Sequence, residues 1–385
     1  MQQKREFIND WMSGVFTVTH LCGHYGISRS LGHRLISRFQ ELGDAGLDEF
    51  SRAPHDIPMK TSAEVEAAIC AERKVHPRWG SEKILAILGR SFPAEELPAI
   101  STGNLILKRN GLILPMRRKR RVEPVYPIFD PKEPNEVWSS DFKGKFRMGN
   151  RIYCHPLTLA DSCSRLVFLA KGMYAPMLLQ TMAAYEGVFR EFGLPLQLHS
   201  DNGPPFGSVQ AISRLTRLAV WLIELGVEPV YSDPAHPEQN GRHERMHREL
   251  KGEATRPPGY DLRAQQRKLN AFVKEYNEVR PHAALGQKTP SQVHRISPRP
   301  FPGEIKEWEY GKEFKVRYVC RNGAIRWGHR GWVGVSTCLI EKYIGLLELG
   351  NGIWEVYFRQ KRIGYLDEKT MRIQDDEGRI KRNLV

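Results

Sequence analysis

The chain has 385 residues, with 58 lysines and arginines against 44 acidic residues, and a formal net charge of +14. This length predicts roughly two to four domains with at least one substantial core. An excess of cations this large indicates a polyanionic partner. The six cysteines are scattered without a Cys-x-x-Cys pair, which argues against a disulfide framework. No apolar run has the length of a membrane span, so we expect a cytoplasmic protein with no membrane partner.

Residues 1–50 have the pattern of a helix-turn-helix domain. Helical spacing recurs in residues 2–14 and 17–24, Ser28 is a favoured N-cap for a third helix, and Gly43 ends that helix. A three-helix bundle that binds protein or dimerises is the alternative, and the positive charge favours DNA. The third helix presents polar and cationic side chains that suit the major groove, namely Arg29, Ser30, His33, Arg34 and Arg38.

Residues 61–114 predict a second, weaker helix-turn-helix-like domain, in which Thr102 caps the last short helix. The next segment, 115–135, is basic and rich in proline. Its five consecutive cations repel one another and cannot pack, so we expect an extended segment. It is either a solvated linker or a clamp for DNA phosphates, and its place before the catalytic part favours the clamp. The five cations are Arg117, Arg118, Lys119, Arg120 and Arg121.

Residues 136–290 have the element order of an α/β domain, because three strands come first and helices then alternate with strands. We expect strands at 138–146, 151–160, 165–170, 196–199 and 228–231, and helices at 176–192, at 209–225 and from Gly241 onward. Three carboxylates stand on a strand, at a strand end and at a helix start, namely Asp141, Asp201 and Glu244. Taken alone, Glu244 among its basic neighbours would indicate an ion-paired helix face. Together the three can meet at one point, as a two-metal phosphoryl-transfer site requires.

These residues resemble the DDE motif of transposases and retroviral-type integrases of the RNase H-like superfamily. The resemblance rests on Asp141, on Asp201 followed by Asn-Gly, and on a Pro-x-x-Asn-Gly-x-x-Glu-Arg run that ends in Glu244 and Arg245. A downstream run, FVKEYNEVRPHAALGQKTP at residues 272–290, is typical of bacterial insertion-sequence transposases of the IS3/IS481 type.

The resemblance implies an RNase H-like core in which Asp141, Asp201 and Glu244 hold two Mg²⁺ ions, with Asp141 bridging both and Mn²⁺ able to substitute. It implies metal-dependent cleavage and joining of DNA strands without a covalent protein intermediate. The expected partners are double-stranded DNA, both the terminal inverted repeats of a mobile element and its target, and further copies of the chain in a DNA-bound homo-oligomer. Arg245 is expected to contact DNA, and the expected location is the bacterial nucleoid.

Two other functions compete with this one: an RNase H-like nuclease that cuts without joining, and a DNA-binding regulator with an inactive core. The two expected helix-turn-helix domains argue against the nuclease, and the presence of all three carboxylates argues against the inactive core. Asp161 is an acidic competitor for the site, and we expect it to cap a turn or to serve the structure instead.

Beyond Pro290, residues 305–375 alternate apolar and polar positions between glycine-rich turns. This pattern predicts a small β-barrel. Such a domain could bind DNA or a partner subunit, and the sequence does not choose between them. The expected fold is therefore multidomain, with N-terminal all-α helix-turn-helix domains, a central α/β core and a C-terminal β-barrel.

Overall fold

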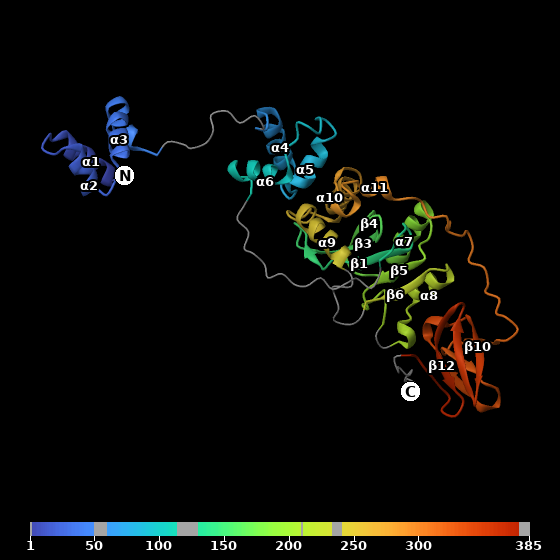
Figure 1. The fold of residues 1–385 in the computed structure, drawn as a ribbon. Helices are drawn as coiled ribbons and strands as arrows, with labels where there is room; N and C mark the ends of the chain where they lie inside the picture. Colours follow the sequence, from blue (N-terminus) through green and yellow to red (C-terminus); the bar gives the residue numbers. More distant parts are fainter. Residues whose placement is uncertain (1, 50–59, 114–129, 209–210, 233–240, 377–385) are drawn as a thin grey trace. The chain divides into compact units, whose positions relative to one another are not determined.

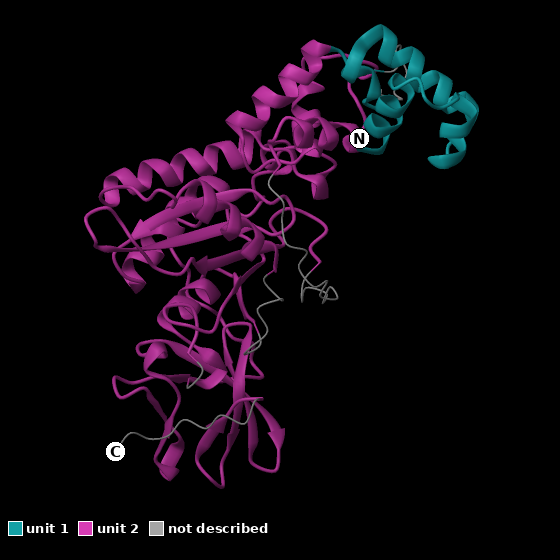
Figure 2. Cartoon of the chain, turned by 90° about the vertical axis from the view of Figure 1, so that its left-hand side faces the viewer, with its two compact units in different colours: residues 1–62 teal, residues 63–385 magenta. Residues whose placement is uncertain are grey.

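The computed structural model describes residues 2–49, 60–113, 130–208, 211–232 and 241–376 (Figure 1). The chain divides into two compact units, Met1–Ser62 and Ala63–Val385 (Figure 2). Each unit is described by itself below. No described helix is both long enough and apolar enough to cross a membrane.

The first unit contains α1 (Gln2–Met12), α2 (Val18–His24), α3 (Arg29–Leu42) and the short η1 (Gly43–Leu47). Its buried core brings Phe7 and Ile8 of α1 against Leu21 of α2 and Leu35 of α3. The side chain of Ser28 accepts a hydrogen bond from the backbone N–H of Leu31 and caps α3, while a glycine with positive φ follows the last turn. The three helices expected from the sequence are therefore confirmed.

Three more helices open the second unit: α4 (Ala63–Val75), α5 (Ser81–Leu88) and α6 (Ile100–Arg109). They pack around Trp79, which is fully buried. The expectation that Thr102 caps the last helix is wrong, because α6 starts at Ile100 and its N-cap is Ala99, three residues earlier. The side chain of Ser81 on α5 donates to the carbonyl oxygen of Ile100 at 2.9 Å, and Gly103 packs closely on Ser81, where an added Cβ atom would be 3.0 Å from the Cβ atom of that serine.

A six-stranded sheet forms the centre of the second unit. Its strands are β1 (Val137–Phe142), β2 (Phe146–Arg147), β3 (Tyr153–Asp161), β4 (Val167–Met173), β5 (Gln197–Ser200) and β6 (Glu228–Tyr231). The order is β4-β3-β1-β5-β6, with β2 pairing to β3. The strands β1, β3 and β4 are antiparallel, and β5 and β6 run parallel to β1. This order confirms the RNase H-like core, although the single strand expected at 138–146 is broken around Gly144.

Helices cover both faces of this sheet (Figure 1). On one face, α7 (Leu178–Phe192) and α8 (Arg217–Glu224) pack on apolar residues such as Trp138. On the other, α9 (Gly241–Glu253) and α10 (Leu262–Lys274) pack on Ala160. The helix expected at 209–225 is shorter than predicted, because residues 213 and 214 adopt positive φ and Thr216 caps α8. Shorter helices complete this part, namely η2 (Ile212–Arg214), η4 (Glu275–Val279), η5 (Ala283–Leu285) and α11 (Pro290–Val293).

The C-terminal strands form open sheets, so the expected closed barrel is not confirmed. Five strands pair in the order β13-β12-β11-β10-β7, and β8 pairs with β9. These elements are β7 (Lys315–Tyr318), β8 (Ala324–Arg326), η6 (Gly328–Arg330), β9 (Trp332–Gly334), η7 (Thr337–Leu339), β10 (Tyr343–Gly350), β11 (Ile353–Phe358), β12 (Lys361–Asp367) and β13 (Arg372–Gln374). Their apolar side chains share one core with Leu215 and with Ala219, Val220 and Ile223 of α8. The C-terminal sheets and α8 therefore share one continuous apolar core.

Candidate active site

Asp141 lies on β1, and Asp201 directly follows β5, the parallel neighbour of β1. In the pairing of β1 with β5, each residue of β1 lies opposite the residue 60 positions further along the chain, from Val137 and Gln197 to Ser139 and His199. The pairing ends there; continued for two more residues, past the end of β5, the same register would bring Asp141 level with Asp201. Because neighbouring strands are about 4.8 Å apart, the two carboxylates come from adjacent backbone positions.

Glu244 comes from α9, in the first turn of the helix. The residues on its two sides, His243 and His247, are buried against the sheet, whereas Glu244 itself is exposed. On a helix, positions three and four apart share a face, so the two histidines fix which way α9 is turned. Their burial leaves Glu244 at the edge of the face that contacts the sheet.

One threonine hydroxyl links two histidines of α9 to the sheet. The Oγ1 atom of Thr158 lies 2.7 Å from Nε2 of His243 and 2.7 Å from Nε2 of His247. Thr158 is the direct partner of Asp141 in the antiparallel pairing of β1 and β3, and its hydroxyl donates to the carbonyl oxygen of Asp141 at 3.0 Å. Directly opposed residues of two strands project to the same face, so Asp141 lies on the face that α9 covers.

The electrostatics of Asp141 reflect its crowded surroundings. Burial, and then the charge of Asp201, raise the pKa of the Asp141 carboxyl to about 7, and Glu244 adds to the shift. Burial also raises the pKa of Asp201. Burial lowers the pKa of His243 to about 3, so this imidazole is neutral at physiological pH. The charges of Asp201 and Glu244 are thus close enough to Asp141 to oppose its ionisation.

The turn after β5 orders the residues around Asp201. The backbone N–H of Gly203 donates to Oδ1 of Asp201 at 3.2 Å. The side chain of Asn202 donates to the carbonyl oxygen of Ser232 and accepts from the guanidinium of Arg214 at 2.8 Å. The Asp-Asn-Gly sequence therefore forms a turn whose amide side chain points away from Asp201 and ties β5 to the end of β6.

The donor set consists of hard oxygen atoms, which suit Mg²⁺ or Mn²⁺. Within the described ranges, no three His, Cys, Asp or Glu side chains already lie close enough together to enclose a metal ion. Residues 233–240, which lead into α9 and Glu244, are outside these ranges. The observation that favours a cation is the electrostatic one, since a raised carboxylate pKa caused partly by other carboxylates is what a bound cation would reverse.

Asp161, the acidic competitor, has a structural role. Its carboxylate accepts hydrogen bonds from the backbone N–H groups of Asn135, Cys163 and Ser164 at 2.8, 2.6 and 3.1 Å. Nδ1 of His294 lies 3.4 Å from the same carboxylate. With its side chain fully buried and its oxygen atoms engaged in this way, Asp161 caps the turn between β3 and β4, as the sequence indicated.

The expected DNA-contacting residues fall into three groups. Four of those on α3 are exposed, whereas the guanidinium of Arg38 donates to the carbonyl oxygen of Asp48 and holds the end of η1 in place. Arg245 is exposed beside Glu244. The cationic run, residues 117–121, lies outside the described residues. The exposed four are Arg29, Ser30, His33 and Arg34.

Sequence reasoning missed two sets of residues near the carboxylates. The first is the pair His243 and His247, whose i, i+4 spacing on a basic helix was the available signal. The second is Arg280 in the downstream run, whose buried guanidinium pairs with Glu249 at 2.8 Å and Glu253 at 2.9 Å on α9. Nothing local in the sequence connects these groups, because they meet only after the sheet has formed.

The comparisons with known proteins agree with this architecture. Residues 131–237 and 225–290 match models of an integrase core domain, and residues 3–55 match a helix-turn-helix domain. An uncharacterized 39.2 kDa protein of insertion element IS476 from Xanthomonas euvesicatoria is 27% identical over 279 residues, which cover 69% of this chain and 75% of that protein. Transposase InsD for insertion element IS2A/D/F/H/I/K from Escherichia coli is 27% identical over 293 residues, which cover 70% and 93%.

Two solved structures align with the chain at low similarity. The catalytic core domain of HTLV-2 integrase in complex with magnesium has 17% identity and a TM-score of 0.35, and the alignment covers 43% of this chain and all of that one. A simian T-cell lymphotropic virus intasome in complex with PP2A regulatory subunit B56 gamma has 15% identity and a TM-score of 0.38, with 77% and 97% covered. These TM-scores are too low to assign residues by superposition.

Proposed function

We propose that this chain, which joins an integrase core to a helix-turn-helix domain and is related to the proteins of insertion elements, is a DNA transposase. It binds the terminal inverted repeats of a mobile element and catalyses cleavage of DNA strands and their transfer into target DNA. The observation that supports the proposal is that Asp141 and Asp201 belong to neighbouring parallel strands, at β1 and just after β5, while the charges of Asp201 and Glu244 both act on Asp141.

Asp141, Asp201 and Glu244 are the proposed ligands of two Mg²⁺ ions, with Asp141 shared and Mn²⁺ as a substitute. Such ions, when bound, activate a water molecule or a DNA 3′-hydroxyl and stabilise the leaving oxygen. The carboxylates supply the negative charge that holds the cations, and the Asp141 carboxyl loses its proton as they bind. No serine, tyrosine or cysteine nucleophile is required.

The buried neutral histidines position this site without taking part in the chemistry. Through Thr158, His243 and His247 fix the rotation of α9 relative to β1. That rotation decides whether the Glu244 carboxylate can reach the ions held by Asp141 and Asp201. A misplacement of about 1 Å at such a site can cost about a hundredfold in rate.

The proposed DNA contacts divide by task. The exposed face of α3 reads the element ends, and Arg245 beside Glu244 contacts the DNA that reacts. The segment 117–121 neutralises phosphates. Pairing of two ends requires more than one copy of the chain, so the active form is a homo-oligomer assembled on DNA.

A strand-transfer assay tests the proposal. The full chain is incubated with labelled duplexes from the imperfect inverted repeats that flank its gene, with Mg²⁺ or Mn²⁺ and a target plasmid. Asp141→Asn, Asp201→Asn and Glu244→Gln should each lower cleavage and joining at least about a hundredfold, since each removes a ligand worth several kcal/mol. End binding should be retained.

The matched control is Glu186→Gln, which neutralises an exposed glutamate of α7 that pairs with Arg190 on the same helix. It should keep wild-type activity. Cleavage without joining by the wild type would instead identify a nuclease, and end binding without either reaction would identify a regulator. Near-normal turnover of any one carboxylate variant would remove that residue from the site.

A further inference from the structure

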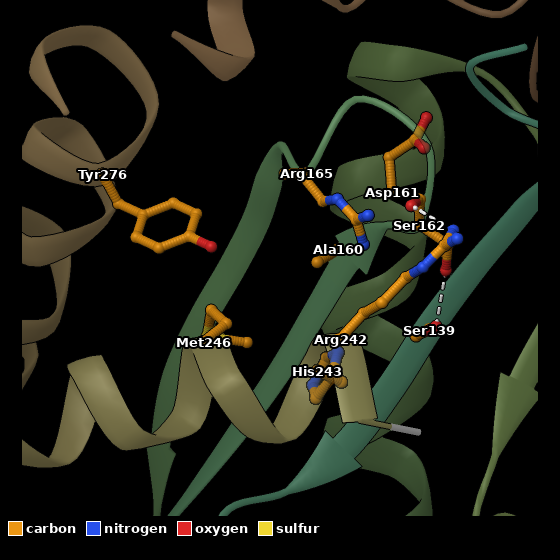
Figure 3. Close-up of a pocket in the computed structure, with 9 residues that line it drawn as sticks. All are labelled: Ser139, Ala160, Asp161, Ser162, Arg165, Arg242, His243, Met246 and Tyr276. Carbon is orange, nitrogen blue, oxygen red and sulfur yellow. Dashed lines mark hydrogen bonds between the residues drawn. The ribbon is translucent and has the colours of Figure 1, made fainter. Parts of the chain in front are cut away.

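A small hollow of about 20 Å³, open to solvent, lies on the face of the sheet that α9 covers, which is also the face that carries Asp141 (Figure 3). Its walls carry Ser139 of β1, Ser162 and Arg165 of the turn between β3 and β4, Arg242 of α9 and Tyr276 of η4. Nothing in the proposed metal chemistry uses these side chains.

The charge in the hollow is positive and incompletely neutralised. Within the described residues, Arg165 has no carboxylate partner, and its guanidinium points into the hollow (Figure 3). Arg242 donates to the carbonyl oxygen of Ser162 at 3.2 Å and to Asp130 at 3.1 Å, but Asp130 is exposed and also pairs with Lys132. Burial, and then the charge of Arg242, lower the pKa of Arg165. A half-buried guanidinium that faces a second cation gains from an anion placed between them.

Tyr276 supplies an independent indication of a ligand. The residue is only 8% exposed, and its ring and hydroxyl point toward Arg165 across the hollow (Figure 3). Within the described part of the chain, its hydroxyl has no hydrogen-bond partner. The hydroxyl can therefore donate a hydrogen bond to a ligand in the space that the guanidinium faces.

Asp161, the one carboxylate among the described residues that line the hollow, repels an anion there only weakly. The carboxylate of Asp161 is turned away from the centre of the hollow (Figure 3). Its oxygen atoms are occupied by three backbone N–H groups. Ser139 and Ser162 pair with each other through their hydroxyls at 2.7 Å and leave lone pairs and one proton to reorient toward a ligand.

The position of the hollow identifies which anion it would meet. Ser139 and Asp141 lie two residues apart on the same face of β1, a separation of about 7 Å at ~3.3 Å per residue. Arg242 lies two residues before Glu244 on α9. A DNA strand whose reacting phosphate lies at the carboxylates therefore carries a neighbouring phosphate past this hollow.

We propose that the hollow is a phosphate site, formed by Arg165, Arg242 and Tyr276, that binds the DNA backbone phosphate next to the one that reacts. The proposal rests on the proposed function, because it takes DNA to be the substrate. Bound there, the phosphate fixes the register of the strand relative to Asp141, as backbone contacts do in other protein–DNA complexes. Free phosphate has the same chemistry and is the other possible source.

The test uses the full chain and a short DNA duplex in which single phosphates are replaced, one position at a time, by uncharged methylphosphonates. Binding is measured by fluorescence anisotropy without divalent metal. For the wild type, replacement of the phosphate at one position should lower the affinity about tenfold, as expected for the loss of one charge-assisted hydrogen-bonded contact. In Arg165→Gln, affinity for the unmodified duplex should fall about tenfold and the same replacement should cost nothing further.

Companion variants separate the site from a loss of folding. Arg165→Lys should restore most of the affinity, and Tyr276→Phe, which removes only the hydroxyl, should lose about threefold. Arg190→Gln makes the same charge change on an exposed part of α7 and should leave the scan unchanged. Melting temperatures verify that all four variants are folded.

A scan in which no position depends on Arg165 overturns the proposal. If inorganic phosphate raises the melting temperature of the wild type but not of Arg165→Gln while the scan is flat, the hollow takes free phosphate and the DNA assignment is wrong. If no replaced position depends on Arg165 but the protein still transfers DNA strands, only the phosphate site is refuted. A positive scan in a protein that never cleaves or joins DNA refutes only the proposed function.

Discussion

Nδ1 of His247 lies 3.5 Å from Oδ2 of Asp141, yet the two side chains do not form an ion pair. Burial, and then the charge of His243, lower the pKa of His247, so its imidazole is neutral. The hydroxyl of Thr158 gives its one proton to the carbonyl oxygen of Asp141, so both histidines must donate to it through Nε2. Nδ1 of His247 therefore carries no proton and does not neutralise the charge of Asp141.

We expect Asp141→Asn to stabilise the metal-free protein at high pH. The carboxyl has a pKa of about 7 in the folded chain, above its value in the unfolded chain of about 3.9. Between these values the folded state holds the extra proton, so stability falls as pH rises and the full cost is present above the folded pKa. Asparagine carries no such cost.

The measurement is the melting temperature of both proteins in EDTA at about pH 5 and about pH 8, chosen on either side of the folded pKa. The advantage of the variant should grow from the lower to the higher pH. Adding Mg²⁺ should raise the melting temperature of the wild type alone. An equal difference at both pH values would mean that Asp141 ionises like an exposed aspartate.

Arg280→Met should destabilise the second unit by about 3 kcal/mol or more. Its side chain is 2% exposed and pairs with Glu249 and Glu253 on α9, and removing one member of a buried ion pair leaves the others uncompensated. Arg78 also reaches Glu249, at 3.4 Å, and limits the loss. Urea unfolding measures the effect.

The control for this substitution is Arg190→Met, which breaks an exposed i, i+4 pair with Glu186. Such exposed pairs contribute less than about 1 kcal/mol. Comparable losses in the two variants would show that burial of Arg280 has no energetic consequence.

Deleting residues 305–385 should destabilise the central domain as well. The deletion uncovers Leu215, Val220 and Ile223, which are buried against the C-terminal sheets. Each loses roughly 1.5–3 kcal/mol of burial, and the exposed patch promotes aggregation. Size-exclusion chromatography and melting curves report both effects. Deleting residues 1–62 removes a unit with its own core and should leave the melting of the rest unchanged.

Arg34→Ala should weaken binding to the element ends by roughly 1–3 kcal/mol if the side chain reaches a base. The residue is exposed on α3, so the substitution leaves the core of the first unit intact. Affinities for end DNA and random DNA should be compared, because only the former should fall. Deleting residues 1–60 should abolish the discrimination altogether. If the ratio of the affinities for end DNA and random DNA were unchanged after that deletion, α4–α6 and not α3 would recognise the ends.

Replacing the five cations at 117–121 by alanine should weaken binding to end DNA and random DNA by similar factors. Phosphates are the same in every sequence, and each lost contact should flatten the slope of log affinity against log salt by roughly one unit. Titrations of both DNAs at several salt concentrations measure this. Unchanged affinity and slope would make the segment a spacer, and a larger loss for A·T-rich ends would indicate minor-groove readout.

The sequence by itself determined the elements whose signals are local. Ser28 and Gly43 mark the ends of α3, and runs of apolar, β-prone residues mark the strand that contains Asp141 and the strand that precedes Asp201. A helix cap or an apolar run acts through neighbours in the chain, so these elements could be predicted. The sequence also indicated the three carboxylates, through their order and through the residues beside them. Their roles stay predictions.

Other features depend on contacts between segments that are far apart in the sequence, and only the tertiary structure decided these. The close packing of α6 on α5 brings Gly103 against Ser81, and the C-terminal strands share their apolar core with α8. The pairing of one threonine hydroxyl with two histidines of α9 has no local signature, since 85 residues separate Thr158 from His243. Burial and strand register change the pKa values of side chains and decide which charges are exposed. Burial and register are set only when the sheet and its helices pack.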